Sequence, residues 1–307
     1  MKNNIAFMTI FVASLLFGAG CQSSPKETLL MGDFFTGNLV RYENGKMDVI
    51  ASGFRGADAI EMGEGIIYVS SWPLGKVWSY NLETKEQKVL KGDFTTAADF
   101  FFDREAKQLV VPDMLESKLM FLKLNDDGTA TLTKTLDAPS KPESVCRGFG
   151  GKLYVTMING NEAGDGGINV IDGGELKEFC RGMNSPKGIA FIGGYLVTAD
   201  ETTMWKVDAH GRVTKLVDAA NFPAPIEFLN DVAASKDGIS VYVTEMGQPG
   251  WMFDPDGERK LWPLNSEKAV SPKKGCVYKV TLEGRVTLAV PAGDDRMLGP
   301  NGVSVAP

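Results

Sequence analysis

Histidine is almost absent from this chain: among 307 residues, His210 stands alone. It lies in the stretch Asp208-Ala209-His210-Gly211, which has the composition of a turn between two strands. We therefore expect His210 to be a solvated turn residue, and mechanisms that need a histidine base are excluded. Nucleophile motifs, phosphate-binding loops and paired-cysteine metal sites are also missing from the sequence.

Cysteine is scarce as well, with four residues at positions 21, 146, 180 and 276. If Cys21 belongs to a targeting segment, three remain, and an odd number argues against a disulfide framework. In the fold inferred below, Cys146 and Cys180 lie on the inner and outer strands of one sheet. Three strand spacings are about 14 Å, too far for a disulfide. We predict that these two thiols are not bonded to each other.

No basic segment stands out, and acidic residues outnumber basic ones by 39 to 32, for a formal net charge of −7. Nucleic acid is therefore not an expected partner. Hydrophobic residues make up 43% of the chain, enough for a sizeable core, and the 35 glycines suit a fold with many tight turns.

A long apolar run is missing too, since the stretch from Ile5 to Phe17 is too short to span a bilayer comfortably. Lys2 precedes this run, and Gly18-Ala19-Gly20-Cys21 follows it. This order resembles a bacterial lipoprotein signal over residues 1–21, with Cys21 as the lipidated residue and 22–28 as a polar tether. We expect an exported, lipid-anchored protein of the cell envelope, periplasmic or on the outer membrane face. An ordinary secretory signal cut nearby is the alternative.

What the sequence does contain is one pattern repeated at a period of roughly 40 residues, the range of propeller blades. Each unit has a β-rich run, a polar turn and a second β-rich run, flanked by two shorter apolar stretches. The stronger runs cover residues 29–42, 66–81, 108–124, 152–172, 195–208 and 241–281. Four strands per unit predict an all-β, six-bladed β-propeller over residues 29–307. The C-terminal stretch 299–305 repeats the phase of an inner strand and is expected to complete the first blade.

Polar residues stand just before each inner strand, where the phase directs them to the mouth of the central tunnel. The pairs in register are Ala57-Asp58, Ala98-Asp99, Glu143-Ser144, Lys187-Gly188, Asn230-Asp231 and Asn301-Gly302. Any one of them could simply stabilise its own turn. Their convergence favours a site, because carboxylate and amide oxygens around one axis are the hard ligands that suit Ca²⁺.

A second ring is expected on the same face after each second strand, at Asp33, Trp72, Asp113, Asn159, Asp200 and Glu245. Its members either stabilise turns or contact a ligand, and Trp72 is suited to a ligand platform at a pocket rim. An insertion of the last unit, 247–275, carries Trp251, Phe253 and Trp262. We interpret it as a flap over the pocket, with a locally packed surface decoration as the alternative. The substrate-contacting residues predicted in this way are Asp58, Trp72, Asp113, Asn159 and Trp251.

Three short motifs resemble the superfamily of gluconolactonase, senescence marker protein and luciferin-regenerating enzyme. They are Pro300-Asn301-Gly302-Val303, the stretch 185–191 and the stretch 229–233. The resemblance implies a divalent metal, usually Ca²⁺, held in the tunnel by Glu, Asn and Asp, and hydrolysis of lactones or related esters. The chain departs from that pattern at Lys187, where the family has a metal-binding Asn, and at Ala57, where it has a Glu.

These departures leave two alternatives open for the cation. Either a metal is held by Asp99, Glu143, Asn230, Asp231 and Asn301, or Lys187 takes its place and no metal binds. With a metal, Asp231 or Glu143 would act as the general base. Without one, Lys187 could stabilise a developing oxyanion.

Two functions follow from these alternatives. One is a metal-dependent hydrolase of lactone-like or ester substrates. The other is a non-catalytic exported propeller that binds a small molecule, a glycan or a partner protein through the same face. We expect a monomer that meets the membrane only through its lipid anchor.

Overall fold

The computed structural model describes residues 27–159, 163–257, 259–263, 266–269 and 274–307. The predicted signal peptide 1–21, the lipidation site Cys21 and most of the tether lie outside this part of the chain. Among the described residues, regular helix is limited to three short 3-10 turns, Phe149–Gly151, Ala219–Asn221 and Pro249–Met252. None of the described helices has the length and apolar character needed to cross a membrane.

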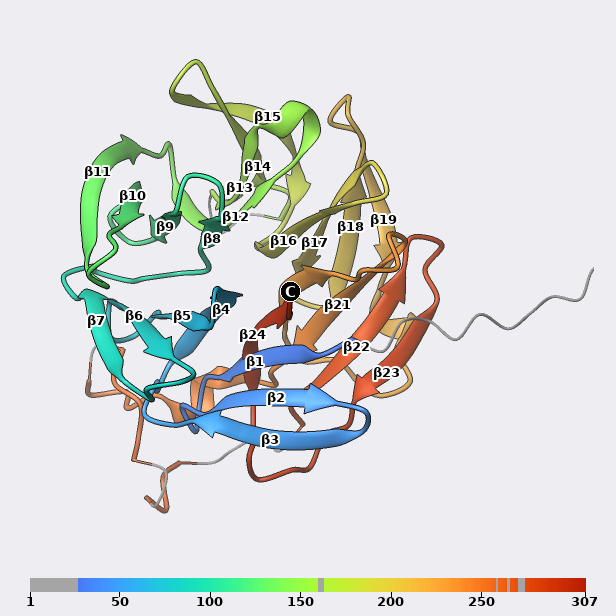
Figure 1. Cartoon of the computed structure of the whole chain (residues 1–307). Coiled ribbons are helices and arrows are strands. Elements are labelled where there is room, and N and C mark those ends of the chain that lie inside the picture. The colour runs from blue at the N-terminus through green and yellow to red at the C-terminus, as the bar shows by residue number, and fades with distance from the viewer. Residues whose placement is uncertain (1–26, 160–162, 258, 264–265, 270–273) are drawn as a thin grey trace, which may run out of the picture.

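Six four-stranded antiparallel sheets surround a central axis (Figure 1). The first blade contains β1 (Leu29–Asp33), β2 (Leu39–Glu43) and β3 (Lys46–Ala51), together with β24 (Pro300–Val305). The second contains β4 (Ala57–Gly63), β5 (Ile66–Ser71), β6 (Lys76–Asn81) and β7 (Gln87–Lys91). The third contains β8 (Phe101–Asp103), β9 (Gln108–Asp113), β10 (Lys118–Leu124) and β11 (Ala130–Asp137).

The remaining three blades have the same order from the axis outward. The fourth contains β12 (Lys141–Arg147), β13 (Leu153–Ile158), β14 (Gly166–Asp172) and β15 (Glu175–Met183). The fifth contains β16 (Pro186–Ile192), β17 (Tyr195–Asp200), β18 (Thr203–Val207) and β19 (Val213–Val217). The sixth contains β20 (Leu229–Ala234), β21 (Ser240–Glu245), β22 (Cys276–Thr281) and β23 (Val286–Val290).

The last strand of the chain closes the ring. β24 pairs antiparallel with β1, with Leu29 opposite Val305 and Met31 opposite Val303. The prediction of six blades, four strands each, with the C-terminal strand completing the first blade is therefore confirmed. Closure leaves no free inner edge between the two ends of the propeller.

The core lies between neighbouring blades because alternate residues of each strand point to opposite faces of its sheet. Ile67 and Val69 of β5 pack against the first blade with Phe54, whereas Tyr68 points toward Phe102 of the third. Buried apolar side chains of this kind fill the other blade junctions as well. The six sheets are thus held around the axis by the packing of their faces against one another rather than by a shared hydrogen-bond ladder.

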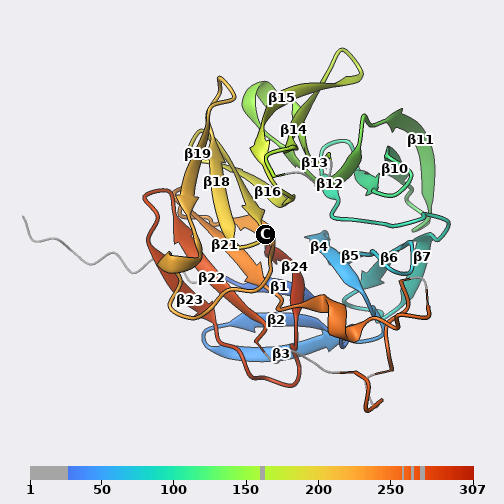
Figure 2. The same cartoon turned by 180° about the vertical axis from the view of Figure 1, so that it is seen from behind.

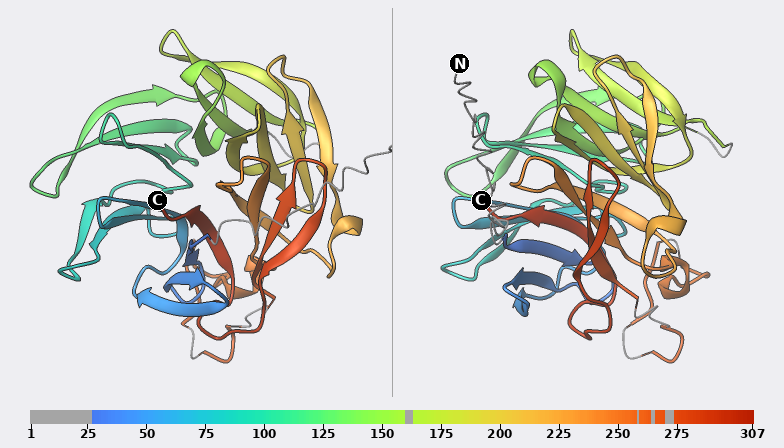
Figure 3. Two further views of the ribbon diagram at one scale, coloured as in Figure 1. Left: turned by 45° about the vertical axis from the view of Figure 1, so that its right-hand side comes forward. Right: turned by 90° about the vertical axis from the view of Figure 1, so that its right-hand side faces the viewer.

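The two ends of the axis differ in what they carry. All inner strands begin on one face, here called the tunnel face, and the long insertion 247–275 emerges there from the sixth blade (Figures 2 and 3). The C-terminal strand ends toward the opposite face. The predicted site residues precede or begin the inner strands, so they lie at the tunnel face.

Candidate functional site

The residues that begin the six inner strands surround the axis at the tunnel face, and we call this region the hub. The strand register arranges its residues in two layers. On each blade one inner-strand residue pairs with the end of the second strand: Ala57, Ala97, Pro142, Pro186, Leu229 and Pro300. The next residue of each inner strand forms an upper layer, namely Asp58, Ala98, Glu143, Lys187, Asn230 and Asn301. The one after forms a lower layer, namely Ala59, Asp99, Ser144, Gly188, Asp231 and Gly302.

This register corrects one pair predicted from the sequence. Asp58, not Ala57, is level with Glu143, Lys187, Asn230 and Asn301. The second blade therefore contributes a carboxylate to the upper layer, where the sequence alignment had placed an alanine. The same register separates Asp99 and Asp231, which lie in the lower layer, from the other predicted ligands.

Three hydroxyl groups on alternate blades connect the layers. The hydroxyls of Ser70, Thr156 and Thr244 accept the backbone N–H of the lower-layer residues Ala59, Ser144 and Asp231 at 3.0, 2.9 and 2.9 Å. Each donates to an upper-layer carbonyl of the next blade, Ala98, Lys187 and Asn301, at 2.9, 2.8 and 2.8 Å. Sequence reasoning missed this relay. The available signal was a hydroxyl residue one position before the second-strand residue that pairs with the start of the inner strand, in three of the repeats. The relay holds the hub backbone in place without using the carboxylates.

The upper layer contains two carboxylates with incomplete hydrogen bonding. Asp58 and Glu143 are only 4% and 6% exposed. Asn301 donates its amide to Asp58 Oδ1, but Asp58 Oδ2 and Glu143 Oε2 have no hydrogen-bond partner among the described residues. Burial, followed by the charges of Glu143 and Asp231, raises the pKa of Asp58 well above its usual value. Burial also raises the pKa of Glu143, against the influence of Lys187.

The lower layer contains Asp99 and Asp231; both oxygens of Asp231 and one oxygen of Asp99 accept hydrogen bonds. Asp231 accepts the backbone N–H groups of Val232 and Val303, both at 2.6 Å, and Ser144 donates its hydroxyl to Asp99. Burial raises the pKa of Asp231 to about 7, although these two amides oppose the shift. Burial and the Asp231 carboxylate raise the pKa of Asp99 well above its usual value.

Both lower-layer acids line a cavity of about 260 Å³ that follows the axis away from the tunnel face. Its walls are apolar inner-strand side chains such as Ile189, Val232 and Val303, and Arg104 and Arg147 stand among its lining residues. The Asp99 and Asp231 pair therefore faces the interior of the channel, whereas Asp58 and Glu143 belong to its mouth.

Lys187 is half-buried in the upper layer and brings a positive charge to the hub. Its ammonium lies over the ring of Phe228, 5.6 Å from the centroid. It acts electrostatically on Asp58 and Glu143, lowering the pKa of each. The lysine thus partly compensates the two carboxylates that lack a full set of hydrogen-bond donors.

Most carboxylates of the second predicted ring accept hydrogen bonds from backbone N–H groups of nearby loops. Asp113 is buried and accepts the backbone N–H groups of Thr95 and Thr96 at 2.9 and 3.0 Å. Asp33, Asp200 and Glu245 bind loop amides in the same way. These bonds agree with the turn-stabilising alternative for this ring.

Two members of that ring are out of register. The residues opposite the inner strands are Ser71 and Met157, so Trp72 lies one position and Asn159 two positions beyond them. Asn159 donates its amide to the carbonyl of Asp165, within its own loop, at 2.9 Å. Trp72 instead packs edge-on against Phe253 of the insertion, 6.2 Å between centroids.

The described residues of the insertion lie across the tunnel face of the first two blades (Figure 2). Phe34, Phe35, Met246 and Met252 form its buried apolar contact, joined by Trp72, Phe228 and Phe253. Arg55 donates to the carbonyl of Trp262, and Arg259 donates to the carbonyl of Thr95 at the third blade. Trp251, predicted to contact a substrate, lies in the 3-10 turn Pro249–Met252, and its side chain is outside the part of the chain that the structure describes.

In the described part of the chain, no group of three or more His, Cys, Asp or Glu side chains is arranged to hold a metal ion. Oxygen donors for a cation are available in the upper layer as Asp58, Glu143, Asn230 and Asn301. The thiols of Cys146, Cys180 and Cys276 are buried and unbonded, so they form no disulfide with one another.

Comparison with known proteins identifies the architecture. No protein-family model and no curated sequence matches the chain. A chain of the nidogen/laminin complex superposes with a TM-score of 0.66 at 13% identity, covering 91% of this chain and 98% of that one. A protein from Lactobacillus plantarum gives 0.58 at 15% identity, covering 92% and 100%, and streptogramin B lyase gives 0.50 at 13%, covering 89% and 75%. At such identities the likeness shows the fold alone.

Proposed function

We propose that the tunnel mouth binds a divalent cation, with Ca²⁺ preferred, and that lactone-like or ester substrates are hydrolysed there. The observation that carries the proposal is the pair of buried carboxylate oxygens, Asp58 Oδ2 and Glu143 Oε2, that lack a partner. A buried charge without a partner costs several kcal/mol, roughly, unless a cation or proton offsets it. The resemblance to the gluconolactonase superfamily supports the substrate class.

The upper layer would hold the ion through Asp58 and Glu143, with the amide oxygens of Asn230 and Asn301 as neutral donors. Such hard oxygen ligands suit Ca²⁺. A bound ion would polarise a substrate carbonyl and lower the pKa of a water molecule. Asp99 and Asp231 stay in the proposal as charges one layer deeper rather than as the main ligands, because both oxygens of Asp231 and one oxygen of Asp99 already accept hydrogen bonds.

The protein's own groups have distinct roles in this proposal. Two backbone amides fix the orientation of Asp231, and its pKa near 7 lets it accept a proton at neutral pH. Glu143, with a free oxygen in the upper layer, is the alternative base. Lys187 would stabilise negative charge on a substrate oxygen from its place over Phe228. Trp72 and Phe253 offer an apolar wall for the rest of the substrate.

A non-catalytic role is the second candidate, and Lys187 favours it. Its ammonium already lowers the pKa of both upper-layer carboxylates, as a metal ion would. In that case the same face would bind a small molecule, a glycan or a partner protein without hydrolysis. Streptogramin B lyase shows that a chain of this fold can be an enzyme; it does not assign a reaction to this one. Export and the lipid anchor at Cys21 stay predictions of the sequence.

A calcium titration followed by thermal melting tests the proposal in the wild type, Asp58→Asn and Lys187→Asn. An ion at a hundred times its Kd stabilises by about 2.7 kcal/mol, so the wild-type melting temperature should rise by several degrees. Asp58→Asn should remove most of the rise, and Lys187→Asn should increase it. Asp48→Asn, in the exposed pair with Arg41, is the control and should respond as the wild type does.

The outcomes separate the two functions. If only Lys187→Asn responds to calcium, the lysine occupies the cation position and the non-catalytic role is favoured. If neither protein responds to any divalent ion, the metal-dependent proposal is wrong. If the wild type binds calcium but hydrolyses neither aryl esters nor aldonolactones, the cation site is supported and the proposed reaction is wrong.

A further inference from the structure

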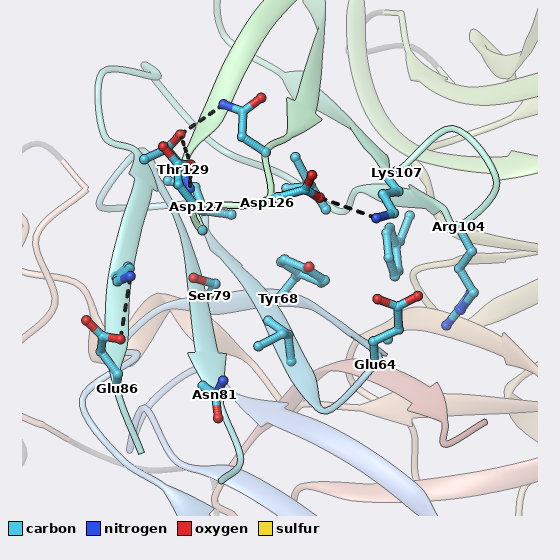
Figure 4. Close-up of a pocket in the computed structure, with 18 of the residues that line it drawn as sticks. Glu64, Tyr68, Ser79, Asn81, Glu86, Arg104, Lys107, Asp126, Asp127 and Thr129 are labelled. Carbon is cyan, nitrogen blue, oxygen red and sulfur yellow. Dashed lines mark hydrogen bonds and ion pairs between the residues drawn. The ribbon is translucent and has the colours of Figure 1, made fainter. Parts of the chain in front are cut away.

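A cavity of about 520 Å³ lies between the second and third blades, away from the hub (Figure 4). One wall consists of residues of β5, β6 and β7; the other comes from β8, Lys107 and the turn between β10 and β11. Its apolar surface is formed by Ile66, Tyr68, Leu90, Phe102 and Leu124. This volume falls within the range of small-molecule pockets, about 300–1,000 Å³.

The cavity exists because one blade lacks a large side chain that the others have. Ser79 of β6 pairs with Tyr68 of β5. The residues in the corresponding place of the other five blades are all larger: Arg41, Phe121, Val170, Lys206 and Lys279. Ser79 is thus the smallest residue at this place in the six blades.

The sixth blade shows what the same place can bind. Tyr242 corresponds to Tyr68, and Lys279 corresponds to Ser79. There the Tyr242 hydroxyl donates to the Glu27 carboxylate at 2.6 Å, and the Lys279 ammonium lies 3.3 Å from the same oxygen. The Glu27 side chain is only 2% exposed. A tyrosine at this register position thus holds a buried carboxylate, supplied within the chain.

In the open cavity the Tyr68 hydroxyl binds no carboxylate of the described chain. Tyr68 packs against Phe102, 5.0 Å between ring centroids, and no described residue hydrogen-bonds its hydroxyl. Lys88 pairs with Ser79 in the sheet, so its side chain lies on the same face and supplies the cation that Lys279 supplies in the sixth blade. Its ammonium forms an exposed pair with Glu86 at 3.5 Å, which costs little to exchange, and it lies beside Gly128 of the turn on the opposite wall.

The rim carries charges of both signs. Lys107 pairs with Asp126 at 3.5 Å, and Arg104 is bound to Glu61 at 3.0 Å. Glu64 and Asp127 are acidic members of the lining. The sixth-blade site tolerates an acid at the corresponding hairpin turn, Asp237, because Lys279 bridges it and Glu27 at 3.0 and 3.3 Å. In the open cavity the cation of this wall is Lys88 of β7, one strand farther from the axis than Lys279 in its own blade.

We propose that this interblade cavity binds a small organic carboxylate with an apolar body. The carboxylate would accept the Tyr68 hydroxyl and pair with Lys88, as Glu27 does with Tyr242 and Lys279. The aryl or alkyl body would lie between Leu90, Phe102 and Leu124. The site is independent of the hub, so it binds whether or not the tunnel mouth holds an ion.

Matched probes test the charge requirement. Phenylacetate, phenylacetamide and phenethylamine share one ring and differ in the head group; binding is followed by calorimetry and by ligand-observed NMR up to about 10 mM. We expect phenylacetate to bind at least about tenfold more tightly than the other two, because hydrogen bonds to a charged acceptor are the stronger ones. Amine binding equal to or tighter than carboxylate binding, or no binding of phenylacetate, overturns the proposal.

Two variants test whether phenylacetate binds in this cavity. Tyr68→Phe removes one oxygen and should weaken phenylacetate about tenfold. Ser79→Phe copies Phe121, the side chain that the third blade has at this place, and should abolish binding by filling the cavity without adding a charge. Tyr195→Phe, on the fifth blade, is the matched control and should leave the affinity unchanged. If Ser79→Phe does not fold, Tyr68→Phe decides alone, and its unchanged affinity refutes the assignment.

Discussion

Replacing Glu27 by Gln should destabilise the propeller, although this residue lies two positions before the first strand. Glu27 Oε2 accepts the Tyr242 hydroxyl at 2.6 Å and the Ser235 hydroxyl at 2.8 Å. The backbone N–H of Lys236 binds the other oxygen, and the Lys279 ammonium lies 3.3 Å away. The start of β1 is thereby tied to the sixth blade, beside the closing strand.

The size of the stability loss follows from the interactions that the glutamine amide keeps and those that it loses. Glutamine retains the size of the side chain and one acceptor oxygen, but it loses the charge and turns an N–H₂ group toward two hydroxyls. Lys279 keeps Asp237 as a partner at 3.0 Å, so it is not left buried alone. Hydrogen bonds to a charged group contribute about 1.5–3 kcal/mol, so we expect a loss of about 2 kcal/mol in the free energy of unfolding. For a chain of this size that corresponds to about 3 °C in Tm.

The loss should depend on pH. Burial alone would raise the pKa of Glu27, but the bonds from Tyr242, Lys236 and Ser235 and the Lys279 charge outweigh it and lower the pKa below 4.5. A lowered pKa stabilises the fold above the unfolded value, and the stabilisation disappears as the pH falls through the folded pKa. The difference between wild type and Glu27→Gln should therefore be constant at neutral pH and shrink below pH 4.5.

Urea unfolding at several pH values, followed by tryptophan fluorescence, measures the effect. Asp48→Asn serves as the control, because its pair with Arg41 is exposed and worth at most about 1 kcal/mol. A Glu27→Gln protein within about 0.5 kcal/mol of the wild type at neutral pH would refute the reasoning. So would a difference that grows as the solution is acidified.

The other predictions concern the hub and the thiols. Thr244→Val leaves the Asp231 N–H without an acceptor and should cost about 1–3 kcal/mol in urea unfolding, whereas Thr214→Val on an exposed strand should cost little. Gly188→Ala brings a Cβ within 2.5 Å of the Asp231 backbone and should lower Tm by several degrees or prevent folding; Gly250→Ala, with open space around it, should not. Reductant should leave Tm unchanged, and a thiol reagent should react with the native protein slowly at all three described cysteines, which are buried: Cys146, Cys180 and Cys276.

The blade repeat and its closure could be read from the sequence because they depend on local patterns. Strand alternation, glycine turns and the phase of Pro300-Asn301-Gly302 recur within each unit, so each unit predicts the next. The same phase was sufficient to bring Asp99, Glu143, Lys187, Asp231 and Asn301 to one hub. It failed by one residue at Asp58: β4 has the same register shift as the inner strands of the fourth, fifth and sixth blades, so Asp58 and not Ala57 corresponds to Glu143, Lys187 and Asn230.

The sequence by itself therefore determined the architecture and which residues face the axis. Only the tertiary structure decided which of their oxygens lack partners, and why the second and third blades leave a cavity. Those properties depend on side chains that meet from distant segments: Glu27 binds Ser235, 208 residues away, and Ser79 matters only beside the facing wall of another blade. A repeat pattern describes what the blades share, whereas a site arises where one blade differs from the rest.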